Sequence, residues 1–222
     1  MDPAIAGAIS LKVGHPEPFE DEELGNIMTL GVPHARGISG LERCSSLQVL
    51  VLVGYGAGEL PDLGRFPDLS SLKVSDSDLR DIGSVHEASA LLSLNLERSL
   101  VSDVSPALEC AGLRWIDVTG NPLSDVSYRE VLPELRARGV DVRASEEREW
   151  SLTRALHEAG LPFAYYLHGD RHRLSRPGLT RTGSPEGGHI GIPPDELEHL
   201  LATSPEDIEP LFDDPNRTPG HL

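Results

Sequence analysis

The sequence predicts an α/β solenoid, a stack of short strand–turn–helix units, followed by a small α+β module. Two observations lead to this prediction. A 22-residue apolar frame recurs in phase through the middle of the chain, and the frame is lost after residue 143. A repeat at a fixed period of this length indicates an architecture in which each unit buries its apolar face against its neighbours.

The clearest unit is LRWIDVTGNPL, which begins at Leu113 and has an Asn at its ninth position. Its first, fourth, sixth and eleventh positions are apolar, and three preceding 22-residue steps keep this frame. The apolar residues are Leu113, Ile116, Val118 and Leu123; Leu91, Leu94, Leu96 and Val101; Leu69, Leu72, Val74 and Leu79; Leu47, Leu50, Leu52 and Ala57. A fourth step, from Gly25, keeps only Met28, Leu30 and Ala35.

Positions four and six of each unit, two residues apart, are typical of a strand with one buried face. Apolar residues also recur at positions fourteen, seventeen and twenty, a spacing that favours a helical or 3₁₀ turn. The ninth position holds Tyr55, Ser77, Ser99 and Asn121. An Asn amide there satisfies backbone groups that the turn leaves unpaired, serine does so in part, and tyrosine does not. We therefore expect the first units to be irregular.

The pattern L-x-x-L-x-L-x-x-N-x-L, followed by Asp-Ile or Asp-Val at Asp81, Asp103 and Asp125, resembles the leucine-rich repeat family. The 22-residue period is that of the short variety found in bacterial internalins. The resemblance covers residues 25–143, about five units, and implies one parallel sheet on the concave side of the solenoid. It is specific for fold and says little about function.

The flanking segments are predicted as caps and a separate module. Residues 1–24 are expected to form an N-terminal cap with a strand over residues 8–13, because terminal repeats need covering. Residues 127–143 predict a convex helix, a stop at Gly139 and a last strand over residues 140–142.

Residues 144–222 predict the C-terminal α+β module. It begins with a helix from Ser145, as N-cap, to Gly160. A hairpin turning at Gly169 and Asp170 follows, then a loop, a short strand at residues 189–192 and a helix from Pro193. A further helical turn and a disordered tail from Asp213 complete it.

The bulk composition bounds the environment. The net charge of −17 disfavours nucleic acid and suits a basic partner protein, or serves solubility alone. Cys44 and Cys110 lie three units apart and cannot pair in a regular solenoid, which favours a reducing compartment. The N-terminus lacks the basic start of a signal peptide, and no apolar run approaches the ~20 residues of a membrane span. We expect a cytoplasmic protein, and the abundance of Arg, Ala, Gly and Pro predicts a bacterial source.

The predicted binding surface is the concave sheet, whose outward positions are three, five and seven of each unit. The candidate partner-binding residues are Val49, Val51, Val53, Lys73, Asn95, Glu97, Trp115 and Asp117. Exposed Val and Trp on a sheet mark contact surfaces, and Trp is a frequent interface anchor. The alternative is that Trp115 packs under the C-terminal module and the N-terminal cap covers the valines.

The segment HGDRHR offers His168, Asp170 and His172 for a metal, but it falls at a predicted turn without a firm third ligand, so a solvated polar turn is expected instead. A local basic stretch, with Tyr165 and Tyr166 nearby, has the composition that a single strand or a phosphate needs, although pairing with acidic groups is expected instead. Its arginines are Arg171, Arg173, Arg176 and Arg181.

No catalytic motif is present: the chain has no P-loop, G-x-S-x-G, strand-linked G-x-G-x-x-G or H-E-x-x-H. We therefore expect no enzyme activity and no cofactor. The leading hypothesis is a protein that recognises a partner, and the resemblance permits an inhibitor or immunity protein for a basic enzyme. A second hypothesis makes the C-terminal module a small enzyme or ligand-binding domain, if Tyr165, Tyr166, His168, Asp170 and His172 converge on a pocket. A third is self-assembly through the concave face. The sequence specifies neither the partner nor the oligomeric state.

Overall fold

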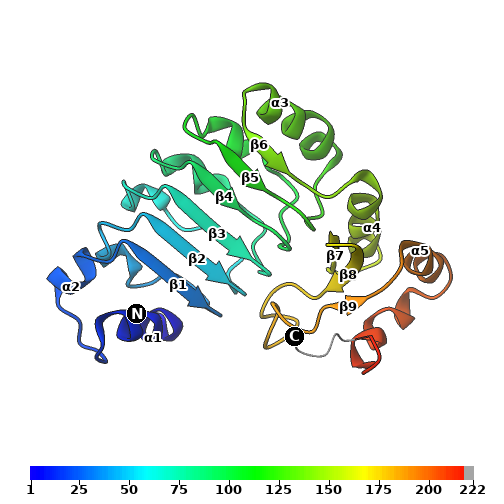
Figure 1. The fold of residues 1–222 in the computed structure, drawn as a ribbon, viewed down its shortest axis with the longest axis horizontal. Coiled ribbons are helices and arrows are strands. Elements are labelled where there is room, and N and C mark those ends of the chain that lie inside the picture. Colours follow the sequence, from blue (N-terminus) through cyan, green and yellow to red (C-terminus); the bar gives the residue numbers. More distant parts are fainter. Residues whose placement is uncertain (218–222) are drawn as a thin grey trace.

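The computed structural model describes residues 1–217 and contains a six-stranded parallel sheet in the order β1 to β6 (Figure 1). The strands follow one another in the chain order of the repeats, so the predicted solenoid with one parallel sheet is present. The strands are β1 (Thr29–Pro33), β2 (Val49–Val53), β3 (Ser71–Ser75), β4 (Ser93–Asn95), β5 (Trp115–Asp117) and β6 (Asp141–Arg143).

The strand register follows the 22-residue period. Val49 pairs with Ser71, Ser71 with Ser93 and Ser93 with Trp115. The first step is shorter, because Thr29 pairs with Val49 and Leu30 with Leu50, 20 residues apart. The frame predicted from Gly25 was therefore wrong by two residues. Met28 does not occupy the buried position of Leu50, and 52% of its surface is exposed.

Short helices cover the convex side of the sheet, as the three-residue spacing predicted. They are the 3₁₀ helices η1 (Leu41–Arg43), η2 (Leu63–Arg65), η3 (Gly83–Glu87) and η4 (Ser105–Glu109), then the π-helical η5 (Ser127–Val131) continuing into α3 (Leu132–Ala137). Leu63, Val85 and Ala107 point from them into the aliphatic core. Val126 departs from the fourteenth-position pattern and is 56% exposed, because the chain there enters the longer helix.

The ninth-position column forms a buried hydrogen-bond ladder. Asn121 Oδ1 accepts from Val101 N at 3.0 Å, while its Nδ2 donates to Leu96 O at 2.7 Å and to Val118 O at 3.1 Å. The hydroxyls of Ser77 and Ser99 lie 2.7 Å apart and share one hydrogen bond. Asn121 thus satisfies backbone groups at the turn, as predicted.

Tyr55 fills the same column differently. Its ring is buried, and its hydroxyl donates to Glu59 O at 3.4 Å. Burial raises the pKa of this hydroxyl to about 12. The early turn is therefore closed by packing of a ring in place of an amide, which agrees with the expected irregularity.

The N-terminal segment is helical, and the strand predicted over residues 8–13 was wrong. Helix α1 (Pro3–Val13) is capped by Asp2, whose Oδ1 accepts from Ala4 N at 2.8 Å, and a short α2 (Asp21–Gly25) follows. Ile5 and Ile9, four residues apart, are buried on the side that faces the solenoid core. A cap and proline at the helix start outweighed the short alternating pattern. The helix covers the open end next to β1 (Figure 1).

The C-terminal part has its own small antiparallel sheet. It comprises α4 (Glu147–Glu158), β7 (Ala164–His168), β8 (Arg171–Ser175), β9 (Ile190–Gly191), α5 (Pro194–Thr203), η6 (Pro205–Asp207) and η7 (Glu209–Asp213). The hairpin turns at Gly169 and Asp170 as predicted. The N-cap of α4 is Glu146, and the prediction of Ser145 was wrong, because the Ser145 hydroxyl accepts from Gly120 N at 3.0 Å.

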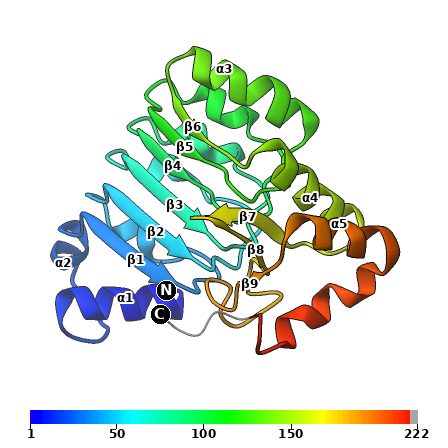
Figure 2. The same ribbon diagram turned by 45° about the vertical axis from the view of Figure 1, so that its right-hand side comes forward.

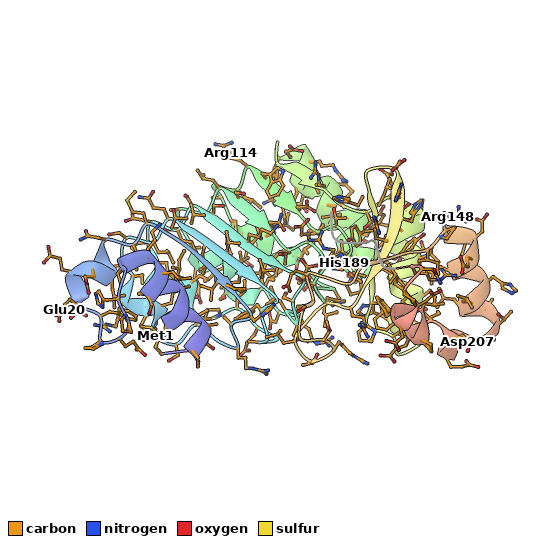
Figure 3. The ribbon with its side chains drawn as sticks, turned by 60° about the horizontal axis from the view of Figure 1, so that its bottom comes forward. Met1, Glu20, Arg114, Arg148, His189 and Asp207 are labelled. Atoms are coloured by element: carbon orange, nitrogen blue, oxygen red, sulfur yellow. The ribbon has the colours of Figure 1, made fainter. Side chains whose placement is uncertain are left out.

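A second apolar cluster, around Phe163, Tyr165 and Leu197, holds the C-terminal part together. On its outer side, Arg148 of α4 pairs with Glu198 of α5 at 2.8 Å (Figure 3). Of the predicted disordered tail, residues 218–222 lie outside the described residues. The division of the chain at 24/25 and 143/144 stays a prediction.

The C-terminal part folds back along the carboxyl ends of the sheet strands (Figure 2). Each of β1 to β5 is followed by an eighth-position residue with positive φ, and all five touch the C-terminal part. They are His34 (φ 59), Gly54 (65), Asp76 (53), Arg98 (50) and Gly120 (74). The contacts include His34 with Glu186 at 2.9 Å, and Gly178 N donating to Asp76 O at 3.0 Å.

Two further contacts lock this junction. Trp150 of α4 stacks on Tyr128 with ring centroids 3.9 Å apart, and its Nε1 donates to Leu123 O at 2.8 Å. Asp78 accepts from Thr180 N at 3.1 Å, and Gly178 lies so close to Asp78 that a Cβ there would overlap the carboxylate. Solenoid and C-terminal part are therefore one packed structure.

Candidate protein-binding surface

The register places the predicted binding residues in rows across the concave face, which we define as the sheet face opposite the 3₁₀ helices. One row runs through Val51, Lys73, Asn95 and Asp117, and a parallel row has Val49 at one end and Trp115 towards the other. Neighbouring strands lie about 4.8 Å apart, so the backbone sets the spacing along each row. Figure 1 shows the face of β2 and β3 turned towards the viewer.

The apolar members of the surface are partly exposed. The alternation in β2 buries Leu50 and Leu52 and leaves Val49, Val51 and Val53 at intermediate exposure. Trp115 is also partly exposed on β5. These side chains are therefore available at the surface while their strand neighbours anchor the core.

The charged members of the surface pair with one another. Lys73 Nζ lies 2.6 Å from Glu97 Oε1, and Arg98 lies 2.9 Å from Glu97. Arg98 also makes two hydrogen bonds to Asp76, at 2.6 and 3.0 Å. Burial opposes ionisation of Glu97, but Arg98 and Lys73 outweigh it and hold its pKa below the ordinary value. The middle of the concave face is thus an ion-pair network whose Arg98 the sequence analysis had not singled out.

Asp117 departs from the prediction, because it is only 2% exposed and does not lie on an open surface. Its Oδ1 accepts from Thr119 N at 2.9 Å, and its Oδ2 lies 3.8 Å from Arg143 Nη1. Burial raises the pKa of Asp117 above its usual range. The carboxylate lines a cavity that the C-terminal part forms over the end of the sheet.

This cavity, called the hairpin cavity below, has a volume of about 370 Å³. It lies between the ends of β4 and β5, the start of α4 and the β7–β8 hairpin. Tyr166 of β7 forms part of its wall, with the Arg98 guanidinium 5.1 Å from the ring centroid. The Tyr166 hydroxyl is 2.6 Å from His189 Nδ1, and His189 is labelled in Figure 3.

Glu149, near the start of α4, is a buried carboxylate in the wall of the hairpin cavity. Its Oε1 lies 2.8 Å from His172 Nε2, whereas its Oε2 has no hydrogen-bond partner among the described residues. Nothing in the local sequence distinguishes Glu149 from other first-turn glutamates, because its surroundings come from a strand and a hairpin distant in the chain.

The five hairpin residues suspected of catalysis do not all converge on one pocket, although Tyr166 and His168 both line the hairpin cavity. Tyr165 is buried, donates to Ile192 O at 2.9 Å and stacks on His172 at 5.5 Å. Tyr166 lies on the opposite side of β7, and His168 and Asp170 are exposed. Within residues 1–217, no three His, Cys, Asp or Glu side chains are placed to hold a metal ion.

The arginines of the basic stretch differ in their contacts and exposure. Arg176 packs its guanidinium 4.4 Å from the Phe212 ring centroid, and Arg171 lies 3.9 Å from Asp170. Arg181 is exposed in the loop before β9.

Among the described residues, no helix has the length and apolar character to cross a membrane.

No protein-family model and no curated protein matches this chain. Among solved structures it is similar to internalin C2 of Listeria monocytogenes, at 18% identity over 66% of this chain and 77% of that one, with a TM-score of 0.46. A second internalin of that organism, InlF, has 17% identity over 69% of this chain and 54% of its own, with a TM-score of 0.44. The functional domain of InlJ, with its cysteine ladder, has 13% identity, coverages of 68% and 44%, and a TM-score of 0.27. The strand register itself is the evidence for a leucine-rich-repeat-like solenoid.

Proposed function

We propose that this protein is a recognition module that binds a partner protein through the concave face. The observation that carries the proposal is the pair of side-chain rows, which present partly exposed valines and Trp115 at spacings set by a six-stranded sheet. Side chains fixed by a rigid backbone lose little ordering entropy on binding. A surface of this kind suits recognition of a preformed protein surface.

The proposed partner is basic. The chain carries a net charge of −17, and a field of that sign speeds encounter with a cationic surface. One version of the proposal is an inhibitor or immunity protein that covers a basic enzyme. We place this encounter in a reducing cytoplasm, in keeping with two free cysteines. We propose no catalytic step, because the suspected hairpin residues face different sides of their strands.

The test is capture of a partner from the native host by the tagged full chain. Trp115→Ala and Val51→Glu should each abolish capture and leave the melting temperature and circular dichroism unchanged. Val126→Glu is the matched control, because it makes the same substitution at a residue 56% exposed on the convex side. A partner captured equally by all four proteins would contradict the proposal.

Salt identifies the electrostatic part of the interaction. At about 1 M salt, the Debye length falls to about 3 Å, so a partner held by the acidic field should be released. Addition of the purified protein to the activity assay of the captured partner then tests the inhibitor version. An unchanged rate with a saturated complex would refute inhibition and leave recognition standing.

A further inference from the structure

The hairpin cavity adjoins the concave face and has an excess of negative charge. Glu97, Asp117, Glu146 and Glu149 line it, against Arg98 and Arg143. Four carboxylates and two guanidinium groups leave two formal negative charges in excess. Arg98 already pairs with Asp76 and Glu97, so its positive charge is not available to neutralise the other carboxylates of the cavity.

Two of these carboxylates have one oxygen that accepts no hydrogen bond from the described residues, although Asp117 Oδ1 accepts from Thr119 N at 2.9 Å. Glu149 is 7% exposed, and its Oε2 has no partner among the described residues. Asp117 is 2% exposed, and its nearest cationic atom, on the 71% exposed side chain of Arg143, is 3.8 Å away. A buried acceptor without a donor costs about 1–3 kcal/mol, so Glu149 Oε2 favours an incoming hydrogen-bond donor, and Asp117 Oδ2 is free to accept from the same group.

The shape and lining of the cavity suit a side chain better than a bare ion. Its volume of about 370 Å³ far exceeds that of one cation, and the described residues offer no three-ligand metal group there. Leu167, 47% exposed, lies in the wall and offers apolar surface to an aliphatic stem. Asp117 comes from the sheet and Glu149 from α4, so a donor group with several N–H directions is needed to serve both.

We propose that the hairpin cavity binds the guanidinium group of an arginine side chain presented by the partner, with Asp117 and Glu149 as the accepting carboxylates. A guanidinium has five N–H donors in a planar fork and pairs with carboxylates in preference to other groups. This inference rests on the proposed function, since it assigns one contact of the same partner. The cavity then anchors a basic residue beside the apolar rows.

The experiment titrates the full chain with Nα-acetyl-arginine amide and with its neutral isostere, Nα-acetyl-citrulline amide, and follows binding by protein NMR. The arginine compound should bind with a dissociation constant on the order of 1 mM, and the citrulline compound about tenfold more weakly. Equal binding of the two compounds, or binding of neither, would overturn the inference.

Two conservative variants locate the site. Glu149→Gln can keep an oxygen for His172 and places an amide NH₂ where Oε2 now lies, and Asp117→Asn makes the same exchange on β5. Each variant should bind the arginine compound about tenfold more weakly than wild type does. Glu130→Gln is the control, because it removes the same charge from an exposed position outside the cavity and should change nothing. If one variant fails to fold, the other variant and the wild-type comparison of the two compounds still decide.

The same variants separate this inference from the proposed function. The partner that wild type captures should dissociate from Glu149→Gln at a lower salt concentration than from Glu130→Gln. If capture depends on Trp115 and Val51 while the two compounds bind alike, this inference alone fails. If the arginine compound binds selectively while capture ignores Trp115 and Val51, the concave-face proposal alone fails.

Discussion

Replacement of Asn121 by alanine tests the hydrogen-bond ladder that closes the repeat turns. Asn121 is 2% exposed and makes three hydrogen bonds to backbone groups of its own and the preceding unit. The alanine side chain supplies neither the acceptor for Val101 N nor the donors for Leu96 O and Val118 O. The perturbation therefore removes polar partners from a buried turn.

The expected loss follows from those groups. An unsatisfied buried donor at Val101 costs about 1–3 kcal/mol, and the two carbonyls add to this, although Val118 O keeps a backbone bond from Asn121 N at 3.3 Å. We expect a total of about 3 kcal/mol. For a chain of this size, that lowers the melting temperature by about 6–12 °C. Asn121→Ser, which imitates Ser77 and Ser99, should cost about half as much.

Urea unfolding followed by circular dichroism measures the effect, with Asn26→Ala as the matched control at an exposed asparagine. The control should stay within about 0.5 kcal/mol of wild type. If Asn121→Ala also stays within about 0.5 kcal/mol, the amide is not holding the turn and the reasoning is refuted.

Three further predictions follow from the junction and the core. Asp78→Ala removes the acceptor for Thr180 N, so trypsin should cut the loop before β9 faster than in wild type, while unchanged cleavage would contradict this anchoring role. Burial lowers the pKa of His157 to about 4, so the unfolded chain binds more protons below about pH 6.5. The free energy of unfolding should therefore fall as the pH drops from 6.5 towards 4, by up to about 3 kcal/mol more in wild type than in His157→Gln. The same pH dependence in both proteins, measured by urea unfolding, would disprove this. Burial raises the thiol pKa of Cys44 and Cys110 to about 11. At pH 8, both thiols should therefore react with a thiol reagent on the order of 100-fold more slowly in the folded protein than in urea. Rapid labelling of the folded protein would contradict this prediction.

Local patterns were sufficient wherever one unit interacts with the next unit. Leu72 and Leu94 lie at the same position of adjacent units, and the register pairs them as the period required. Asn121 could be assigned its turn role because its partners, Leu96, Val101 and Val118, lie in its own or the preceding unit. The helix α1 was missed because six alternating residues satisfied a strand pattern, and the decisive cap, Asp2, lies outside that window.

The 22-residue period was sufficient to predict the solenoid and its convex helical turns, and the resemblance to leucine-rich repeats implied the parallel sheet and the rows in which Val51, Lys73 and Trp115 lie. These predictions rest on a repeated pattern, and such a pattern persists because stacked units repeat the same local environment. The sequence did not predict that the C-terminal part folds along the eighth-position column and buries Asp117. Those contacts join residues about a hundred positions apart, such as Asp78 and Thr180, whose side chains have no pattern in common. The hairpin cavity, with a Glu149 oxygen that has no partner within residues 1–217, exists because two differently built parts of the chain pack together.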